Sequence, residues 1–224
     1  YVSYATAFSP QVGFDAYGTP FKPTTGEQGE VGIKYQMPSL PVLLTAAVFD
    51  IVQNNVLRTD PNNIVFLAST GQVESKGLEL EAKLSLKQGI DLTAAYTRLN
   101  VVITQGEPDT TGNQLSGIPR NSFAAFGKYT FQPSSPVEGL AVGMGVRYIG
   151  ASFGDDLNTF ENPSVTLVDA MVEYDAGKFD RRLSGAYLRV NARNLFDKQY
   201  QACQSGFCYA GERRQVIGSL TYRW

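Results

Sequence analysis

Apolar and polar residues alternate one by one through long stretches of this chain. The clearest stretch runs from residue 78 to 86, where aliphatic residues alternate with charged or hydroxyl residues: Leu78, Glu79, Leu80, Glu81, Ala82, Lys83, Leu84, Ser85 and Leu86. An alternation with a period of two predicts a β-strand with one apolar and one polar face. Similar runs recur along the chain and predict ten strands, at residues 1–8, 27–37, 43–57, 71–86, 90–102, 121–132, 140–148, 168–174, 188–192 and 215–224.

The last run ends on aromatic residues. One of its faces is mostly apolar and comprises Val216, Gly218, Leu220, Tyr222 and Trp224. Outer-membrane barrels end in an aromatic strand that closes the sheet at the lipid interface. We therefore expect Tyr222 and Trp224 to take part in barrel closure and assembly.

The links between the runs alternate in length. Four are short, at residues 38–42, 87–89, 133–137 and 176–185, and five are long, at residues 9–26, 58–69, 104–116, 152–163 and 197–210. A transmembrane up-and-down barrel has short periplasmic turns and long extracellular loops. The chain is therefore predicted to be all-β and to form part of a transmembrane antiparallel up-and-down β-barrel. Its C-terminus is expected in the periplasm and its residues 197–210 outside the cell.

A soluble β-sandwich is the main alternative, because its core strands also alternate. The run at residues 71–86 is longer than typical soluble strands, and many consecutive polar faces carry charges, which favours the barrel. Aromatic residues also gather near both ends of the runs, as two interfacial girdles would. They are Tyr35, Phe131, Tyr174, Tyr222 and Trp224 near the short links, and Tyr96, Phe123 and Tyr148 near the long ones.

The composition narrows the function classes. Charged residues make up 18% of the 224 residues, and 22 Gly with 11 Pro favour strands and turns over helix bundles. The net charge of −2 argues against nucleic acid as a partner. No window approaches the roughly 18 apolar residues of a transmembrane helix. We therefore expect any membrane crossing to be made by strands, whose alternation is compatible with the mean hydropathy of −0.16.

The sequence contains no histidine. This excludes catalysis by Ser-His-Asp or Cys-His groups and histidine-ligated zinc or haem within these residues. We expect no enzyme activity and no directly bound metal ion. Cys203 and Cys208 are predicted to form a local disulfide in an oxidising compartment, because a two-cysteine metal site needs further ligands and none is nearby.

The chain opens on YVSYATAF, which has no initiating Met and no signal peptide and looks like the middle of a strand. We therefore expect residues 1–224 to be the C-terminal portion of a longer β-barrel protein.

Five segments together resemble one family. They are KPTTGEQGEVGIKY, VESKGLELEAKL, GIPRNSFAAFGKY, VNARNLFDKQY and GERRQVIGSLTYRW, and they span almost the whole chain. In this order they resemble the C-terminal half of TonB-dependent outer-membrane receptors for ferric siderophores. The cysteine pair before the last strand is similar to the hydroxamate, or ferrichrome-type, branch of these receptors.

The resemblance implies a 22-stranded barrel filled by an N-terminal plug domain, of which this chain supplies about ten C-terminal strands. The plug, the energy-coupling box and the other strands would lie outside this chain. The implied function is TonB-dependent, energised import of a ferric siderophore across the outer membrane of a Gram-negative bacterium. The implied partners are the ferric siderophore, the TonB complex, outer-membrane lipid and lipopolysaccharide, and the barrel-assembly machinery. A stand-alone barrel with an adhesive, porin-like or structural role is the alternative.

The expected ligand-binding residues lie in the long links. A ferric siderophore brings its own oxygen ligands to iron, so the protein would recognise the complex with aromatic and polar side chains. Phe207 and Tyr209, which flank Cys208, are the first candidates, because the disulfide would fix their direction. Tyr17, Phe14, Phe21 and Phe160 follow. Packing of these aromatic rings against each other or the barrel rim is the alternative.

Charged residues complete the predictions. The residues Glu212, Arg213 and Arg214 are expected either to face the lumen or to form a structural ion pair between neighbouring strands. The carboxylates on polar faces are expected to face the lumen and to contact the plug: Glu79, Glu81, Asp169 and Glu173. Gly143 and Gly145 on an inward face are expected to allow strand curvature or close approach of the plug.

Overall fold

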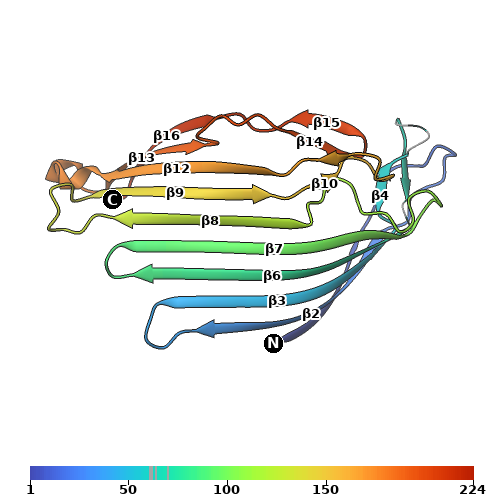
Figure 1. The fold of residues 1–224 in the computed structure, drawn as a ribbon, viewed down its shortest axis with the longest axis horizontal. Helices are drawn as coiled ribbons and strands as arrows, with labels where there is room; N and C mark the ends of the chain where they lie inside the picture. The colour runs from blue at the N-terminus through green and yellow to red at the C-terminus, as the bar shows by residue number, and fades with distance from the viewer. Residues whose placement is uncertain (61–62, 64, 70) are drawn as a thin grey trace.

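The computed structural model describes every residue except 61, 62, 64 and 70. Ten long strands form one antiparallel sheet in which neighbours along the chain are neighbours in space (Figure 1). They are β1 (Val2–Ser9), β2 (Thr24–Gln36), β3 (Val42–Asn54), β6 (Gln72–Leu86), β7 (Ile90–Gln105), β8 (Asn121–Thr130), β9 (Leu140–Ile149), β12 (Val165–Asp175), β13 (Ala186–Arg193) and β16 (Gln215–Tyr222). The predicted strands and their up-and-down order are confirmed.

Several strand ends differ from the predicted ones. β3 ends at Asn54 because the next residue, Asn55, has a φ of 58° and donates its backbone N–H to the Gly71 carbonyl at 2.6 Å. A non-glycine residue with positive φ leaves the extended conformation and ends the strand. β7 continues to Gln105, past the predicted end at residue 102, because it stays paired with β6 through an irregularity at Gln72.

The long links contain three small hairpins that the alternation did not predict. They pair β4 (Leu57–Thr59) with β5 (Leu67–Ser69), β10 (Ser152–Phe153) with β11 (Glu161–Asn162), and β14 (Gln201–Gln204) with β15 (Phe207–Ala210). Two 3-10 turns, η1 (Ala176–Lys178) and η2 (Arg181–Leu183), occupy the link between β12 and β13. Strands of two to four residues are too short to leave a periodic signal. Over the described residues, no helix has the length and apolar character to cross a membrane.

The register places the predicted apolar residues on one face of the sheet. One row crosses six neighbouring strands and consists of Ile33, Ala46, Leu80, Tyr96, Phe123 and Tyr148. This face is open: the side chains of Met144 and Leu220 are 63% and 69% exposed. A continuous exposed apolar surface indicates contact with lipid or with another protein.

The opposite face is polar and carries ion pairs between neighbouring strands. Arg147 of β9 donates to both carboxylate oxygens of Asp169 on β12, at 2.7 and 3.0 Å. Arg189 of β13 donates from two of its nitrogens to a single carboxylate oxygen, Oε2, of Glu173 on β12. Asp169 and Glu173 therefore lie on the predicted polar face, and both have partners within the sheet.

Aromatic rings cover glycines on this polar face. The Phe126 ring of β8 lies across Gly143 and Gly145 of β9, where an added Cβ would come within 2.6 and 3.0 Å of the ring carbons. Close approach of a side chain to the backbone thus explains these two glycines. Strand curvature and close approach of the plug, which we expected at these glycines, stay predictions.

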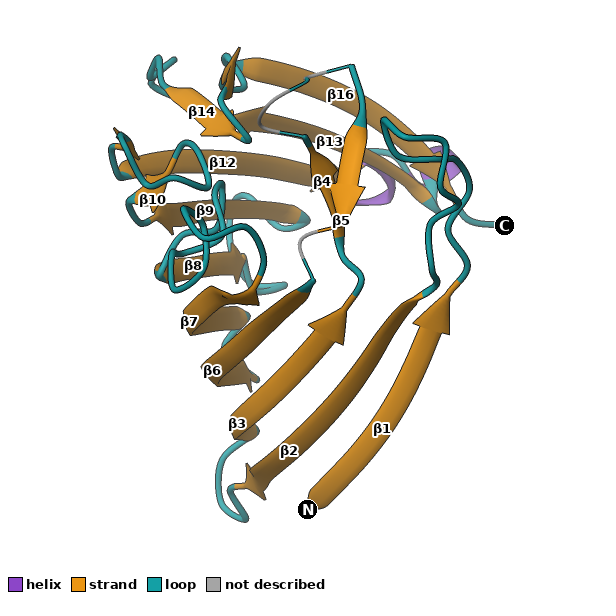
Figure 2. Cartoon of the chain, turned by 90° about the vertical axis from the view of Figure 1, so that its right-hand side faces the viewer, coloured by secondary structure: helices purple, strands orange, loops and turns teal. Residues whose placement is uncertain are grey.

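The sheet is a curved wall with two free edges (Figure 2). Among the described residues, β1 pairs only with β2 and β16 only with β13. These ten strands therefore do not close on themselves.

The buried apolar core is small and lies at one end of the polar face. Val73, Val101 and Ile103 form its centre, and Leu115 and Ile118 pack against them from the link after β7. Because side chains alternate along a strand, Val73, Val101 and Ile103 lie on the same face of the sheet as the polar residues of β6 such as Glu79. Val56, which directly precedes β4, also packs against this core, and Figure 2 shows the β4–β5 hairpin on the concave side of the sheet. The polar face is therefore the concave one.

Candidate functional site

All five long links gather at one end of the sheet, and the short turns lie at the other end (Figure 1). We number the long links as loops: the first is residues 10–23, the second 55–71, the third 106–120, the fourth 150–164 and the fifth 194–214. Loops on a rigid sheet are a common location for binding sites.

The first loop contains a tight turn, from Asp15 to Thr19, that is organised by one carboxylate. Asp15 accepts hydrogen bonds from the backbone N–H groups of Tyr17 and Thr19 at 2.9 and 2.8 Å. Asx turns of this kind fix a loop locally without tertiary contacts. As a result Tyr17 stands at the tip, where it is 94% exposed.

The third and fourth loops are joined by paired hydrogen bonds. The Asn158 side chain accepts from the Gln114 N–H at 2.9 Å and donates to the Gln114 carbonyl at 2.8 Å. Asp156 accepts from the Ser116 N–H at 3.0 Å. Because Ser116 is fully buried, these bonds lie inside the junction and hold the two loops together.

The fifth loop docks on the other two through its hairpin. The predicted disulfide between Cys203 and Cys208 is present and links β14 to β15. Ser205 N–H donates to the Ser116 hydroxyl at 3.0 Å, and Gly206 N–H donates to the Gly154 carbonyl at 3.0 Å. We call the third, fourth and fifth loops together the three-loop block.

One buried asparagine shapes the base of the fifth loop. The Asn194 side chain donates to the carbonyls of Lys198 and Glu212 at 2.8 and 2.9 Å and accepts from the Lys198 N–H at 2.8 Å. Asn194 is 1% exposed and has a φ of 46°, a conformation that asparagine tolerates better than most residues. The two ends of a long loop are thereby tied to one side chain.

An ion pair closes the same loop. Arg213 donates to both carboxylate oxygens of Asp197, at 2.9 and 2.6 Å, and the Arg214 N–H donates to Asp197 at 2.9 Å. The Arg213 side chain, followed by the Arg214 N–H, holds the pKa of Asp197 far below its usual range. Arg213 thus has a structural partner, although that partner lies within the loop and not on a neighbouring strand.

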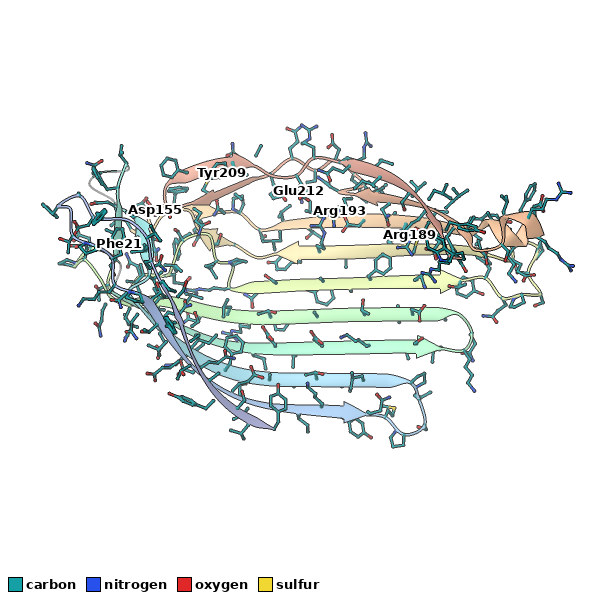
Figure 3. The ribbon with its side chains drawn as sticks, turned by 180° about the vertical axis from the view of Figure 1, so that it is seen from behind. Phe21, Asp155, Arg189, Arg193, Tyr209 and Glu212 are labelled. Carbon is teal, nitrogen blue, oxygen red and sulfur yellow. A yellow bond between two sulfur atoms is a disulfide. The ribbon has the colours of Figure 1, made fainter. Side chains whose placement is uncertain are left out.

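A cavity of about 630 Å³ lies among the five loops. Each loop contributes to its wall, with Phe21, Leu67, Glu107, Asp155 and Ser205 as examples. Figure 3 shows Phe21 and Asp155 at the same end of the molecule although they come from the first and fourth loops. A volume in this range suits a ligand of the size of a small organic chelate.

The predicted site residues divide into two groups. Tyr17 and Phe21 line this cavity, whereas Phe14 and Phe160 do not. Phe14 pairs with Pro20 in an isolated bridge, and the Phe160 ring packs against Gly154. Phe160 therefore packs within the loops, which was the alternative to ligand contact for these aromatic residues.

The two residues beside the disulfide lie outside the large cavity. Phe207 and Tyr209 are 41% and 66% exposed on β15. Tyr209, which is labelled in Figure 3, lines a smaller hollow of about 180 Å³. Tyr200 and Asn162 line the same hollow. The contact of Phe207 and Tyr209 with a ligand stays a prediction.

The sequence did not single out the carboxylates of the cavity. Among the described residues its wall contains Asp15, Asp60, Glu107, Asp155 and Asp156 against one cation, Lys22. A signal was available, because the first four long links each carry an acidic residue. Over the described chain, no group of three or more Cys, Asp or Glu side chains is placed to hold a metal ion.

Comparisons with known proteins agree with the fold. The family model for the TonB-dependent receptor-like β-barrel matches residues 1–195. The chain is 37% identical to the ferrichrome outer membrane transporter/phage receptor of Escherichia coli K12, over 100% of this chain and 30% of that protein. It is 38% identical to the ferrioxamine B receptor of Salmonella typhimurium LT2, over 99% of this chain and 31% of that protein.

A solved structure is similar along the whole chain. The crystal structure of the siderophore receptor PiuA from Acinetobacter baumannii superposes with a TM-score of 0.74 at 26% identity, over 99% of this chain and 33% of that one. The chain thus spans about a third of the length of these three proteins. These proteins are a transporter and receptors rather than enzymes. From the family match over residues 1–195 and the shared antiparallel sheet, this chain belongs to the TonB-dependent receptor-like β-barrel family.

Proposed function

We propose that this chain is part of an outer-membrane receptor that imports a ferric siderophore, of the hydroxamate type, in a TonB-dependent and energised manner. One observation carries the proposal: the identity of 37% and 38% to a ferrichrome transporter and a ferrioxamine B receptor extends over 99–100% of the chain, loops included. The cavity of about 630 Å³ among the loops supports it, because a ferric siderophore must first be captured at the outer mouth.

The two faces of the sheet fit this role. The convex apolar face meets the lipid of the Gram-negative outer membrane, and the concave polar face lines the lumen. The long loops are extracellular and the C-terminus is periplasmic. Trp224, which is fully exposed, and Tyr222 then lie at the inner interface, where aromatic side chains are favoured.

The remainder of the receptor lies outside these residues. We place residues 1–224 as the C-terminal portion of a 22-stranded barrel whose plug fills the lumen and contacts TonB. The free edges of β1 and β16 support this arrangement, because unpaired backbone groups in lipid cost several kcal/mol each. Tyr222 and Trp224 would be read by the barrel-assembly machinery, and lipopolysaccharide would surround the outer rim.

The ligand needs no metal site in the protein. A ferric hydroxamate holds its iron with its own oxygens, so loop residues have only to bind the surface of the chelate. Tyr17 and Phe21 line the cavity and are the aromatic residues placed to do so, while Phe207, Tyr209, Phe14 and Phe160 would contact a ligand only outside it.

Uptake by cells tests the proposal. Iron-limited cells that lack the full-length gene are supplied with radioiron-labelled siderophores of the hydroxamate, catecholate and carboxylate classes. We expect loss of hydroxamate uptake, restored by the gene on a plasmid. Unchanged uptake across the whole panel would refute the transport function.

The alternative was a stand-alone barrel with an adhesive, porin-like or structural role. The ten strands described here leave two unpaired edges, which does not support closure by these strands alone. A receptor that binds no siderophore but conducts ions in a planar bilayer would support the porin-like role.

A further inference from the structure

A carboxylate in the wall of the sheet holds the base of the fifth loop. Ala170 and Ala192 are the last paired residues of β12 and β13 before this loop begins. Just beyond them, the Asn194 N–H donates to Oδ1 of Asp169 on β12 at 2.9 Å. The Asp169 side chain therefore accepts an N–H group where the ladder between the two strands has ended.

Arg147 fixes the direction of this carboxylate. Its Nη2 donates to Oδ1 of Asp169 at 3.0 Å, and its Nε donates to Oδ2 at 2.7 Å. Two bonds from a planar guanidinium orient a carboxylate more firmly than one bond does. Oδ1 is thereby held in the position at which it receives the Asn194 N–H.

The base of the loop depends on this acceptor. Asn194 is 1% exposed, so its N–H would be shut off from water if it had no partner in the protein. The side chain of the same residue binds backbone groups of Lys198 and Glu212, near the two ends of the loop. A side chain that fixes Asn194 consequently fixes the whole base of the fifth loop.

We infer that Asp169 is a positioning residue for ligand capture, which holds the fifth loop through Asn194 from the concave wall of the sheet. The hairpin of that loop contributes Ser205 and Gly206 to the wall of the large cavity, whereas Asp169 does not line it. The inference rests on the proposed function and adds a residue outside the loops to the same site. When the base loosens, fewer receptors hold a complete cavity wall, and the apparent affinity falls with that fraction.

A second ion pair on the same strand provides a matched control. Glu173 lies four residues further along β12 and binds Arg189 of β13 on the same concave face. Among the described residues, its carboxylate accepts hydrogen bonds from Arg189 and from no loop. The two ion pairs thus share a strand, a face and a chemistry, and they differ in the contact with the fifth loop.

Three double variants of the full-length receptor test the inference. Arg147→Met with Asp169→Leu removes the acceptor and leaves no unpaired partner charge in the wall. Arg147→Met with Asp169→Asn supplies an amide oxygen that accepts the Asn194 N–H without the charge. Arg189→Met with Glu173→Leu removes the other ion pair and leaves the loop contact in place.

Two quantities are measured on each purified receptor: amide hydrogen exchange at residues 194–214 and the affinity for a ferric trihydroxamate. With Asp169→Leu we expect loop exchange to rise about tenfold, as the loss of a hydrogen bond to a charged acceptor implies. We expect the affinity to fall about threefold, as when two thirds of the receptors lack a complete cavity wall. The Asp169→Asn and Glu173→Leu receptors should match the wild type in both, and unchanged exchange in β6 and β7 shows that the sheet is folded.

The outcomes separate the inference from the proposed function. Loop exchange that Asp169→Leu leaves unchanged, or that Glu173→Leu raises equally, overturns the inference. An affinity that Asp169→Leu leaves unchanged also overturns it, because the position of the loop would then not matter for capture. An Asp169→Asn receptor as impaired as the Asp169→Leu receptor overturns it as well, since the acceptor oxygen would not be what the loop needs.

Failure of the wild-type receptor to bind the ferric trihydroxamate overturns the proposed function and, with it, the role of Asp169 in capture. The exchange measurement needs no ligand, so it still decides whether Asp169 holds the loop.

Discussion

Asn162 and Cys203 lie in different loops, 41 residues apart, and are joined by two hydrogen bonds. The Asn162 side chain donates to the Cys203 carbonyl at 2.8 Å and accepts from the Cys203 N–H at 2.8 Å. Both residues are buried, at 8% and 6% exposure. The asparagine amide thus replaces a β-ladder partner for the strand that carries the disulfide, and it docks the β14–β15 hairpin on the fourth loop.

Replacement of this side chain should loosen the hairpin. In Asn162→Ala the Cys203 N–H and carbonyl lose their partner in a buried location, which costs about 1–3 kcal/mol. We expect faster amide hydrogen exchange at residues 201–210 in the full-length receptor, with unchanged exchange in β6 and β7. Gln201→Ala, at an exposed neighbouring position, is the control. Unchanged protection of the hairpin in Asn162→Ala would contradict the docking role.

The ion pair in the fifth loop should persist to a lower pH than a pair made by an aspartate of ordinary pKa. The pKa of Asp197 is depressed in the folded protein by the Arg213 side chain and the Arg214 N–H. A group with a depressed folded pKa contributes stability that is present above its unfolded pKa, about 3.9, and is lost as the pH falls through the folded value. We expect the carboxyl NMR signal of Asp197 to show no midpoint near pH 4.

The same ion pair offers a matched variant. Asp197→Asn removes the charge and should increase hydrogen exchange at residues 212–214 at neutral pH, where the native loop is protected. Asp180→Asn, in the turn at the opposite end of the sheet, should leave this loop unchanged. A titration midpoint of Asp197 near pH 4 would contradict the contribution of Arg213.

The ten strands followed from the sequence because each has two faces in different surroundings. Selection for an apolar convex face and a polar concave face imprints a period of two on every strand, as at residues 78–86. The alternation of short and long links then predicted the antiparallel up-and-down order of the strands. Both kinds of signal are local, and they were sufficient for the wall of the barrel.

The candidate site depends on contacts that leave no local pattern. The bond between Asn162 and Cys203, or between Ser205 and Ser116, joins residues 41 and 89 positions apart. The cavity follows from such contacts, whereas the small hairpins were missed because strands of two to four residues leave no periodic signal. Loop aromatics were therefore proposed as a class, and only Tyr17 and Phe21 line the cavity, while its carboxylates were not singled out.

The Phe126 ring and Gly143 should behave as a coupled pair. A Cβ at Gly143 would come within 2.6 Å of the ring, so Gly143→Ala must displace it, at a cost of about 1–3 kcal/mol for overpacking. In a Phe126→Ala background the same change should cost much less. Urea unfolding of the four proteins of this double-mutant cycle in lipid vesicles measures the coupling. Additive effects would show that the ring does not need the glycine.

The central claim is that a receptor built on this sheet imports ferric siderophore with energy from the cell. Its most direct test is uptake of a radioiron-labelled ferric trihydroxamate by iron-limited cells, with the full-length gene present or deleted and with or without an uncoupler of the proton gradient. We predict accumulation only in energised cells that carry the gene. Equal accumulation in deleted and gene-bearing cells would contradict the account.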